Sequence, residues 1–215
     1  NGSGSASANG MFAKSILRMG VPVAARNIFP SNIQGLPTWF EVRITEAGRL
    51  GRRGGVDLMV AMNPQTWDKD VAEIESGGFL FYDSTKPLPP GKFRDDITVL
   101  GVPLTAMCNA RYQLPRERQL FKNIVYVGAL AALLGIDPGV IETLLAEQFS
   151  GRQKLIDANV EALHMGVDYV KANLGPIRLQ VRRADKVGDR IYVAGNDAAG
   201  LGAVYGGATV CAWYP

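Results

Sequence analysis

The first ten residues combine glycines and serines in a pattern that could bind phosphate. They lead directly into an amphipathic run, so the backbone N–H groups of Asn1–Gly10 would converge at the positive N-terminal end of a helix, a geometry that suits phosphate. The glycines permit positive φ and close approach of a ligand, and the serine hydroxyls can donate to phosphoryl oxygens. The candidate cofactor-binding residues are Gly2, Ser3, Gly4, Ser5, Ala6 and Ser7.

This segment matches neither the GxGxxG fingerprint nor a Walker A loop, because it has no Lys followed by Ser or Thr. A flexible Gly/Ser linker is the alternative interpretation. The uninterrupted run into an amphipathic helix favours the phosphate loop.

A second candidate binding segment follows the first predicted strand. Phe29–Pro37 is rich in Pro, Gly and polar residues, so it predicts a shaped loop rather than a tight hairpin. By its own composition it is as compatible with an inert connection as with a binding loop.

Bulk composition excludes several classes of protein. The chain has 215 residues, 47% of them apolar and 20% charged, which is ordinary for a soluble globular protein. A net charge of +3 is too small to predict a nucleic-acid surface. The longest apolar run, Ile124–Leu134, is about half of the ~20 residues that span a bilayer, so we predict no membrane segment.

The titratable residues predict no metal site. Cys108 and Cys211 show no metal-ligand spacing and fit a reducing, cytoplasmic compartment. The single histidine, His164, lies within a helical pattern and has no His or Cys partner four residues away. We interpret it as a helix-surface or core histidine.

The elements that must position these residues alternate between strand and helix in the first half. Helix is predicted for 8–19 and 64–76, and strand for 21–28, 39–45, 56–62, 79–82 and 97–102. The helix at 64–76 between two apolar strands predicts a βαβ unit. Ligands in such sheets bind at the carboxyl ends of the strands.

The second half is predominantly helical. Helices are predicted at 116–134, 137–149 and 152–173, with Gly135 and the Asp137-Pro138 pair as end signals. Beyond Gly175-Pro176 we predict strands at 177–182, 190–194 and 208–213, and a helix at 198–207. The predicted fold class is α/β, a Rossmann-like, mostly parallel sheet with helices on both faces, a helical C-terminal segment and the start of a second α/β domain.

Three separated motifs, in this order, resemble the 2-oxoacid:ferredoxin oxidoreductases. The Gly-rich segment, helix, strand and Phe29-Pro30-Ser31-Asn32-Ile33-Gln34-Gly35 look like the gamma domain of that family. Lys122-Asn123-Ile124-Val125 through Leu134-Gly135-Ile136 looks like its characteristic helix. Residues 195–203 and Tyr214-Pro215 are similar to the opening of the alpha subunit. The resemblance implies a gamma domain at 1–175, a connection at 176–194, and at 195–215 the start of a thiamine diphosphate pyrimidine-binding domain, which this chain would contain only in part.

The resemblance also implies an activity. The fused order of gamma and then alpha is typical of enzymes that convert 2-oxoglutarate or other 2-oxoacids to acyl-CoA, or run the reverse carboxylation, and exchange electrons with ferredoxin. Coenzyme A would bind this domain, at Gly2 to Ser7. Thiamine diphosphate with Mg²⁺ and an iron-sulfur cluster would lie elsewhere in a hetero-oligomer, on a beta subunit or beyond Pro215. The substrate-channel loop would comprise Pro30, Ser31, Asn32, Ile33, Gln34, Gly35, Tyr214 and Pro215.

Two departures separate this chain from the family motifs. Ser5, Ala6 and Ser7 stand where Gly, Gln and Gly are common, and Gln34 replaces an arginine that could pair with a carboxylate or phosphate. No catalytic residue is predicted within the chain, and its two cysteines cannot supply the about four thiolates of a cluster. A scaffold domain that binds no ligand, and a generic nucleotide-binding module, are the alternative functions.

Overall fold

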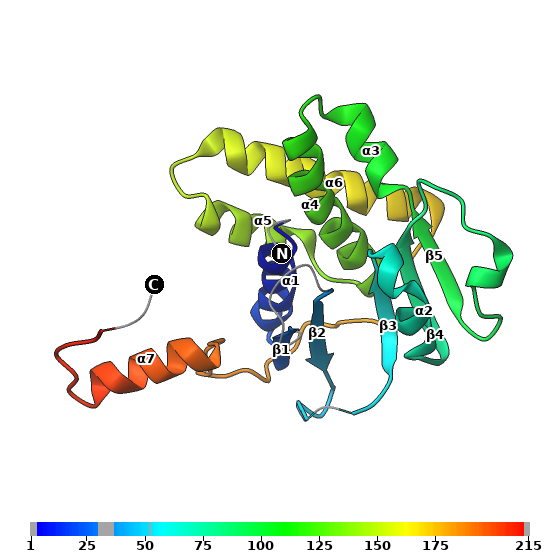
Figure 1. Cartoon of the computed structure of the whole chain (residues 1–215). Coiled ribbons are helices and arrows are strands. Elements are labelled where there is room, and N and C mark those ends of the chain that lie inside the picture. The colour runs from blue at the N-terminus through cyan, green and yellow to red at the C-terminus, as the bar shows by residue number, and fades with distance from the viewer. Residues whose placement is uncertain (1–3, 30–36, 52, 213–215) are drawn as a thin grey trace.

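A three-stranded parallel sheet forms one half of the fold. The computed structural model describes residues 4–29, 37–51 and 53–212 (Figure 1). The strands, in the order β3-β4-β5, are β3 (Val56–Ala61), β4 (Ile74–Asp83) and β5 (Thr98–Val102). The predicted βαβ unit is confirmed, because a short 3₁₀ turn, η1 (Pro64–Thr66), and helix α2 (Trp67–Ala72) connect β3 to its parallel neighbour β4.

Helix α2 is shorter than the predicted 64–76. Its last residues were expected to continue to Ser76, but Ile74 already pairs with Val56 of β3. The guanidinium of Arg94 donates to the carbonyl oxygens of Val71 (2.9 Å) and Ile74 (2.8 Å). These bonds take up carbonyls that a continuing helix would use, so the chain enters β4 five residues earlier than predicted.

The first two strands form a separate antiparallel pair. β1 (Val23–Ile28) and β2 (Trp39–Ile44) pair from Val23 opposite Ile44 to Ile28 opposite Trp39. Both strands were predicted, but no hydrogen-bonded ladder between described residues joins this pair to the parallel sheet.

Alternation along β4 places the sheet between two apolar layers. Phe79 and Phe81 belong to the main core, which also includes residues of the large helices, whereas Leu80 belongs to a smaller core with Trp67 and Val71 of α2. Successive side chains of a strand point to opposite faces, so both faces of the parallel sheet are covered. The α/β class with helices on both faces is therefore confirmed.

Helices supply most of the main core. They are α1 (Ser5–Arg18), α3 (Leu104–Arg111), α4 (Pro115–Leu134), α5 (Pro138–Gln148) and α6 (Gln153–Asn173). The three consecutive helices α4 to α6 end as predicted: Gly135 takes a left-handed conformation (φ 70°) after α4, and the Asp137 side chain accepts the N–H of Gly139 (3.0 Å). Helix α3 was not predicted.

The segment after α6 contains none of the strands expected at 177–182 and 190–194. Its backbone N–H groups form isolated hydrogen bonds to carbonyl oxygens at helix ends instead of a ladder. Ile177 donates to Leu133 (3.1 Å), Val181 to Leu134 (2.7 Å) and Ala184 to Met19 (2.8 Å). Apolar residues here pack over the ends of α4 and α1, and this tertiary packing overrides the strand preference of the segment.

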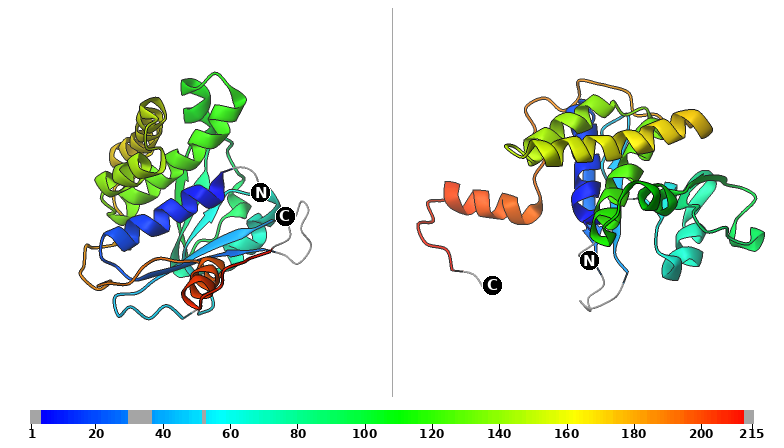
Figure 2. Two further views of the ribbon diagram at one scale, coloured as in Figure 1. Left: turned by 90° about the vertical axis from the view of Figure 1, so that its left-hand side faces the viewer. Right: turned by 90° about the horizontal axis from the view of Figure 1, so that it is seen from above.

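The last helix, α7 (Gly195–Tyr205), confirms the helix predicted at 198–207. None of its residues is buried, and Figure 2 shows it set apart from the other helices. The strand expected at 208–213 is not formed over 208–212, where the chain is exposed coil. In the described part of the chain, no helix is long and apolar enough to cross a membrane.

Candidate functional site

The N-terminal end of α1 carries the described part of the predicted phosphate loop. The helix begins at Ser5, so Ser5, Ala6 and Ser7 form its first turn and not a loop, which corrects the predicted start at Ala8. Gly4 is the N-cap, with a φ of 79° that favours glycine. The carbonyl oxygen of Gly4 accepts the N–H of Ala8 (3.2 Å), which is the first hydrogen bond of the helix.

Among the described residues, this helix end has no acidic side chain in its own first turn. The first turn of α1 contains no acidic side chain, and its N-cap makes no side-chain hydrogen bond to the backbone. The partial positive charge of a helix N-terminus is therefore not countered by a carboxylate of the same turn. Ala6 and Ser7 are exposed, so their backbone lies at the surface.

Helix α4 fixes the position of this end. A Cβ added at Gly4 would lie 3.2 Å from Leu120 Cδ2 and 3.4 Å from Asn123 Nδ2. One turn further along each helix, the Tyr126 hydroxyl donates to Asn9 Oδ1. Burial raises the pKa of Tyr126, so the phenol stays protonated and remains a donor. The start of α1 is thus held against α4.

The carboxyl ends of β4 and β5 hold a second polar cluster, centred on Asp83. Its carboxylate accepts the Thr85 hydroxyl (2.6 Å) and backbone N–H (3.1 Å), the Thr105 N–H (3.2 Å) and the Thr105 hydroxyl. Thr85 Oγ1 in turn accepts the N–H of Ala106 (3.0 Å). The strand end therefore caps the N-terminus of α3 in place of a side chain from that helix.

Electrostatics at this cluster follow from burial and hydrogen bonding. Burial opposes ionisation of Asp83, but the hydrogen bonds from Thr105 and Thr85 outweigh it and lower the pKa of the carboxyl. Lys122 of α4 donates to Thr105 Oγ1 (3.4 Å). Burial raises the pKa of the Cys108 thiol to about 11, against the opposing effect of Lys122, so the thiol is protonated at neutral pH.

Sequence reasoning missed this cluster. A signal was available, since Asp83-Ser84-Thr85 follows the apolar run of β4 at the strand end where α/β folds bind ligands. Lys122 was singled out only as part of a helix motif. What brings Asp83, Thr105 and Lys122 together is the packing of α3 and α4 against the sheet.

Several predicted site residues lie outside the described residues. These are Gly2, Ser3, Pro30, Ser31, Asn32, Ile33, Gln34, Gly35, Tyr214 and Pro215.

Trp39, the first residue of β2, contacts α2. Its Nε1 donates to Asp70 Oδ1 (2.8 Å), and Lys69 Nζ lies 4.1 Å from the centroid of its ring. His164 lies on the surface of α6, where Nε2 is 2.7 Å from Glu142 Oε1, in line with its prediction.

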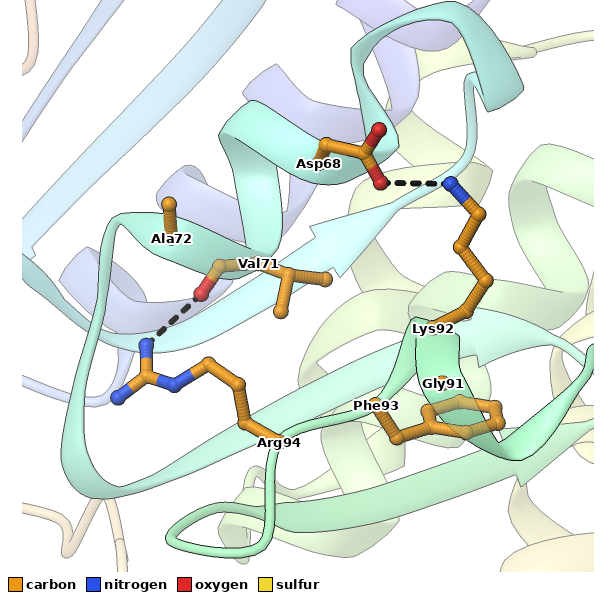
Figure 3. Close-up of a pocket in the computed structure, with 7 residues that line it drawn as sticks. All are labelled: Asp68, Val71, Ala72, Gly91, Lys92, Phe93 and Arg94. Carbon is orange, nitrogen blue, oxygen red and sulfur yellow. Dashed lines mark hydrogen bonds and ion pairs between the residues drawn. The ribbon is translucent and has the colours of Figure 1, made fainter.

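Two surface hollows are lined by residues outside α1. One, of ≈ 490 Å³, lies along 26–29. The other, of ≈ 210 Å³, lies between α2 and 91–94 (Figure 3). Its charged groups already have partners, because Lys92 pairs with Asp68 (2.7 Å) and Arg94 pairs with Asp96 (2.6 Å) and caps α2. We interpret this second hollow as structural.

Comparison with known proteins identifies the family. Residues 1–169 match the family described as pyruvate ferredoxin/flavodoxin oxidoreductase. The chain belongs to this family. Its resemblance to 2-oxoacid:ferredoxin oxidoreductases is thereby confirmed.

Curated members of the oxidoreductase family align along all or part of the chain. The chain is 25% identical, over 100% of its own length, to 2-oxoacid:ferredoxin oxidoreductase 2, subunit alpha, of Aeropyrum pernix, and it spans 39% of that relative. A 2-oxoglutarate oxidoreductase subunit, KorA, of Mycobacterium tuberculosis is 26% identical over 60% of the chain and 22% of the relative.

Solved oxidoreductase structures share the fold. The 2-oxoglutarate:ferredoxin oxidoreductase of Magnetococcus marinus, with 2-oxoglutarate, coenzyme A and succinyl-CoA bound, superposes with a TM-score of 0.82 at 26% identity. The superposition covers 96% of this chain and 36% of the Magnetococcus marinus chain. A keto/oxoacid ferredoxin oxidoreductase gamma subunit of Geobacter sulfurreducens has a TM-score of 0.61 at 22% identity, covering 80% of this chain and 94% of that subunit, a likeness of fold.

Proposed function

We propose that this chain is the gamma-type domain, with the first residues of the alpha-type domain, of a 2-oxoacid:ferredoxin oxidoreductase, and that it contributes to coenzyme A binding and assembly. The whole enzyme would oxidatively decarboxylate a 2-oxoacid, 2-oxoglutarate in our proposal, to its acyl-CoA and reduce ferredoxin, or catalyse the reverse carboxylation. The observation that carries the proposal is the superposition along 96% of the chain with an enzyme solved with coenzyme A and 2-oxoglutarate.

Local chemistry at α1 supports coenzyme A over an uncharged ligand. Coenzyme A carries a diphosphate and a 3′-phosphate, and phosphates bind where backbone N–H groups and the helix dipole converge. The first turn of α1 offers this without a carboxylate of its own. Exposed Ala6 and Ser7 leave the turn accessible.

Domain boundaries at 175 and 194 form part of the same proposal. The segment after Gly175 runs as coil over the ends of α4 and α1, and α7 has no buried residue. A helix without a covered face is expected where a domain begins whose core lies in other parts of the protein.

Thiamine diphosphate, Mg²⁺ and an iron-sulfur cluster would be held by other parts of the enzyme, including a beta subunit. The donor set of this chain does not fit a cluster, because it contains two cysteines, of which Cys108 is buried and Cys211 exposed. Among the described residues, no three His, Cys, Asp or Glu side chains gather as metal ligands. A cytoplasmic location stays part of the proposal.

A charge placed in the first turn of α1 tests the coenzyme A site. In Ala6→Glu the new carboxylate would face the phosphates, and Kd for coenzyme A, measured by calorimetry, should rise about tenfold or more, since like charges disfavour binding. The same carboxylate would interact favourably with the dipole of α1, so the melting temperature of the Ala6→Glu variant should stay the same or rise. Ala6→Gln is the matched neutral control, with little change in Kd.

Equal affinities of the Glu and Gln variants would place coenzyme A elsewhere. Absence of coenzyme A binding to both the chain and the complete complex would overturn the proposed function.

A scaffold role is the second candidate, favoured by one observation. The two hollows described above contain no residue of α1. Unchanged coenzyme A kinetics in the complex carrying Ala6→Glu, together with normal assembly, would support the scaffold. Tighter binding of NAD or a flavin than of coenzyme A would instead indicate a nucleotide-binding module.

A further inference from the structure

Lys122 of α4 is a half-buried cation with unused hydrogen-bond donors. Among the described residues its ammonium forms one hydrogen bond, to Thr105 Oγ1 at 3.4 Å, which is longer than an ordinary N–H···O bond, and it forms no ion pair. An ammonium has three N–H donors, and charged groups withdrawn from water are ordinarily paired. Lys122 therefore keeps donors and a positive charge for an anion that the described chain does not supply.

The Asp83 carboxylate does not take up this charge by a direct contact. Its oxygens accept the hydroxyl and backbone N–H groups of both Thr85 and Thr105. The Thr105 hydroxyl donates to Asp83 and accepts from Lys122, so it lies between the carboxylate and the ammonium. This arrangement holds Lys122 at the carboxyl end of the parallel sheet while the lone pairs of Asp83 are occupied by other donors.

Helix α4 places Lys122 beside the first turn of α1. Leu120 and Asn123 of α4 flank Gly4, the N-cap of α1, and Lys122 lies between them in the sequence. Successive helical residues are 100° apart, so Lys122 lies on the adjoining face of α4 and contacts Thr105 of α3. Helix α4 packs against both α1 and α3 (Figure 1). A ligand at the start of α1 could therefore reach Lys122 with a second group.

We propose that Lys122 binds the 3′-phosphate of coenzyme A and so selects this ligand over 3′-dephospho-coenzyme A. The inference rests on the coenzyme A binding proposed above. The phosphates of the diphosphate carry one negative charge each and suit the backbone N–H groups of α1. The 3′-phosphate is a monoester with a second pKa of about 6, so it is largely a dianion at neutral pH. A dianion favours the compact charge of an ammonium, which Lys122 supplies one ribose away from the diphosphate.

Calorimetry on the complete enzyme with two ligands tests this role. The native enzyme should bind coenzyme A about tenfold or more tightly than 3′-dephospho-coenzyme A, since a matched charge pair adds affinity. In Lys122→Gln this preference should fall to nearly one, because Kd for coenzyme A rises while Kd for the dephospho ligand stays the same. Lys122→Arg keeps the charge and should retain most of the preference.

Lys86→Gln is the matched control for the loss of one positive charge. Lys86 directly follows Thr85 at the same strand end, but its side chain is exposed. Solvent screens an exposed charge, so this variant should keep the native preference between the two ligands. A preference lost equally in the Lys86 and Lys122 variants would reflect net charge alone and would overturn the inference.

Other outcomes would also contradict a specificity role for Lys122. An unchanged preference in Lys122→Gln would overturn it, as would equal weakening of both ligands together with a lower melting temperature, which would make Lys122 structural. A higher KM for the 2-oxoacid with an unchanged ligand preference would assign Lys122 to the substrate carboxylate instead. Failure of the native enzyme to bind either ligand would overturn the proposed function and this inference with it.

Discussion

Trp39 and Asp70, 31 residues apart, are joined by a hydrogen bond of 2.8 Å from the indole Nε1 to the carboxylate Oδ1. The other carboxylate oxygen accepts the Thr66 hydroxyl (2.6 Å), and Asp70 is 4% exposed. One buried side chain thus connects the start of β2 to α2.

Removing this carboxylate should destabilise the fold. Asp70→Ala leaves the indole N–H of Trp39 without its acceptor, and a buried polar group left unpaired costs about 1 to 3 kcal/mol. It also removes the shorter hydrogen bond of the Thr66 hydroxyl (2.6 Å), which keeps the Asn63 carbonyl oxygen (3.2 Å) as an acceptor. The free energy of unfolding in urea measures the loss. Asp68→Ala is the control on the same helix: its side chain is 81% exposed and forms a surface pair with Lys92, so the change should stay within about 0.5 kcal/mol. Equal losses in the two variants would contradict this role of Asp70.

Gly128 and Gly166 should not tolerate a methyl group. A Cβ at Gly128 would lie 2.0 Å from the Leu163 carbonyl oxygen, and one at Gly166 would lie 1.9 Å from that of Val125, so α4 and α6 approach backbone to backbone. Either alanine variant should lose about 1 to 3 kcal/mol or more in thermal or urea unfolding. Gly10 lies within α1, and a Cβ added there would have no atom within 4 Å apart from its chain neighbours and the backbone of its own helix, so Gly10→Ala should gain about 0.5 to 1 kcal/mol. Stable Gly128→Ala and Gly166→Ala proteins would show that the helices can separate.

Stability should fall in acid through Asp83. The folded-state pKa of this carboxyl is lowered by Thr105 and Thr85, so its stabilising contribution is present above the unfolded value of about 3.9 and is lost as the pH falls through the folded value. Thr105→Val removes one donor, so the pKa of Asp83 should rise toward the unfolded value. Titration of the carboxyl by NMR measures this, and an unchanged pKa would mean that Thr105 is not the donor that lowers it.

The two cysteines should differ in reactivity. Burial and a pKa of about 11 keep the Cys108 thiol protonated and inaccessible at pH 8, whereas Cys211 is exposed. A disulfide reagent should therefore label Cys211 rapidly in the native chain and Cys108 only after unfolding, as peptide mapping would show. Cys211→Ser is the control and should abolish the rapid phase. Fast native labelling of that variant would indicate that α3 opens.

Local signals explain the elements that the sequence predicted. Gly135 ends α4 and Asp137-Pro138 begins α5 because caps act within a few residues. The alternation along 39–45 predicts β2, and the short apolar run at 79–82 predicts part of β4. The family resemblance rests on motifs that are likewise local. The sequence by itself therefore determined the α/β class, the βαβ unit, the three C-terminal core helices and the family.

Only the tertiary structure decided the rest, because the deciding contacts join residues far apart in the chain. The strand expected at 177–182 is coil, because backbone N–H groups of 177–184 donate to carbonyl oxygens at the ends of α4 and α1. Asp83 becomes the cap of α3 through Thr105, 22 residues away. The separation of the β1–β2 pair from β3 depends on which strand edges pair. The hydrophobic pattern of a strand indicates which of its faces is buried but not which strand lies beside it, so the sequence pattern could not predict this separation.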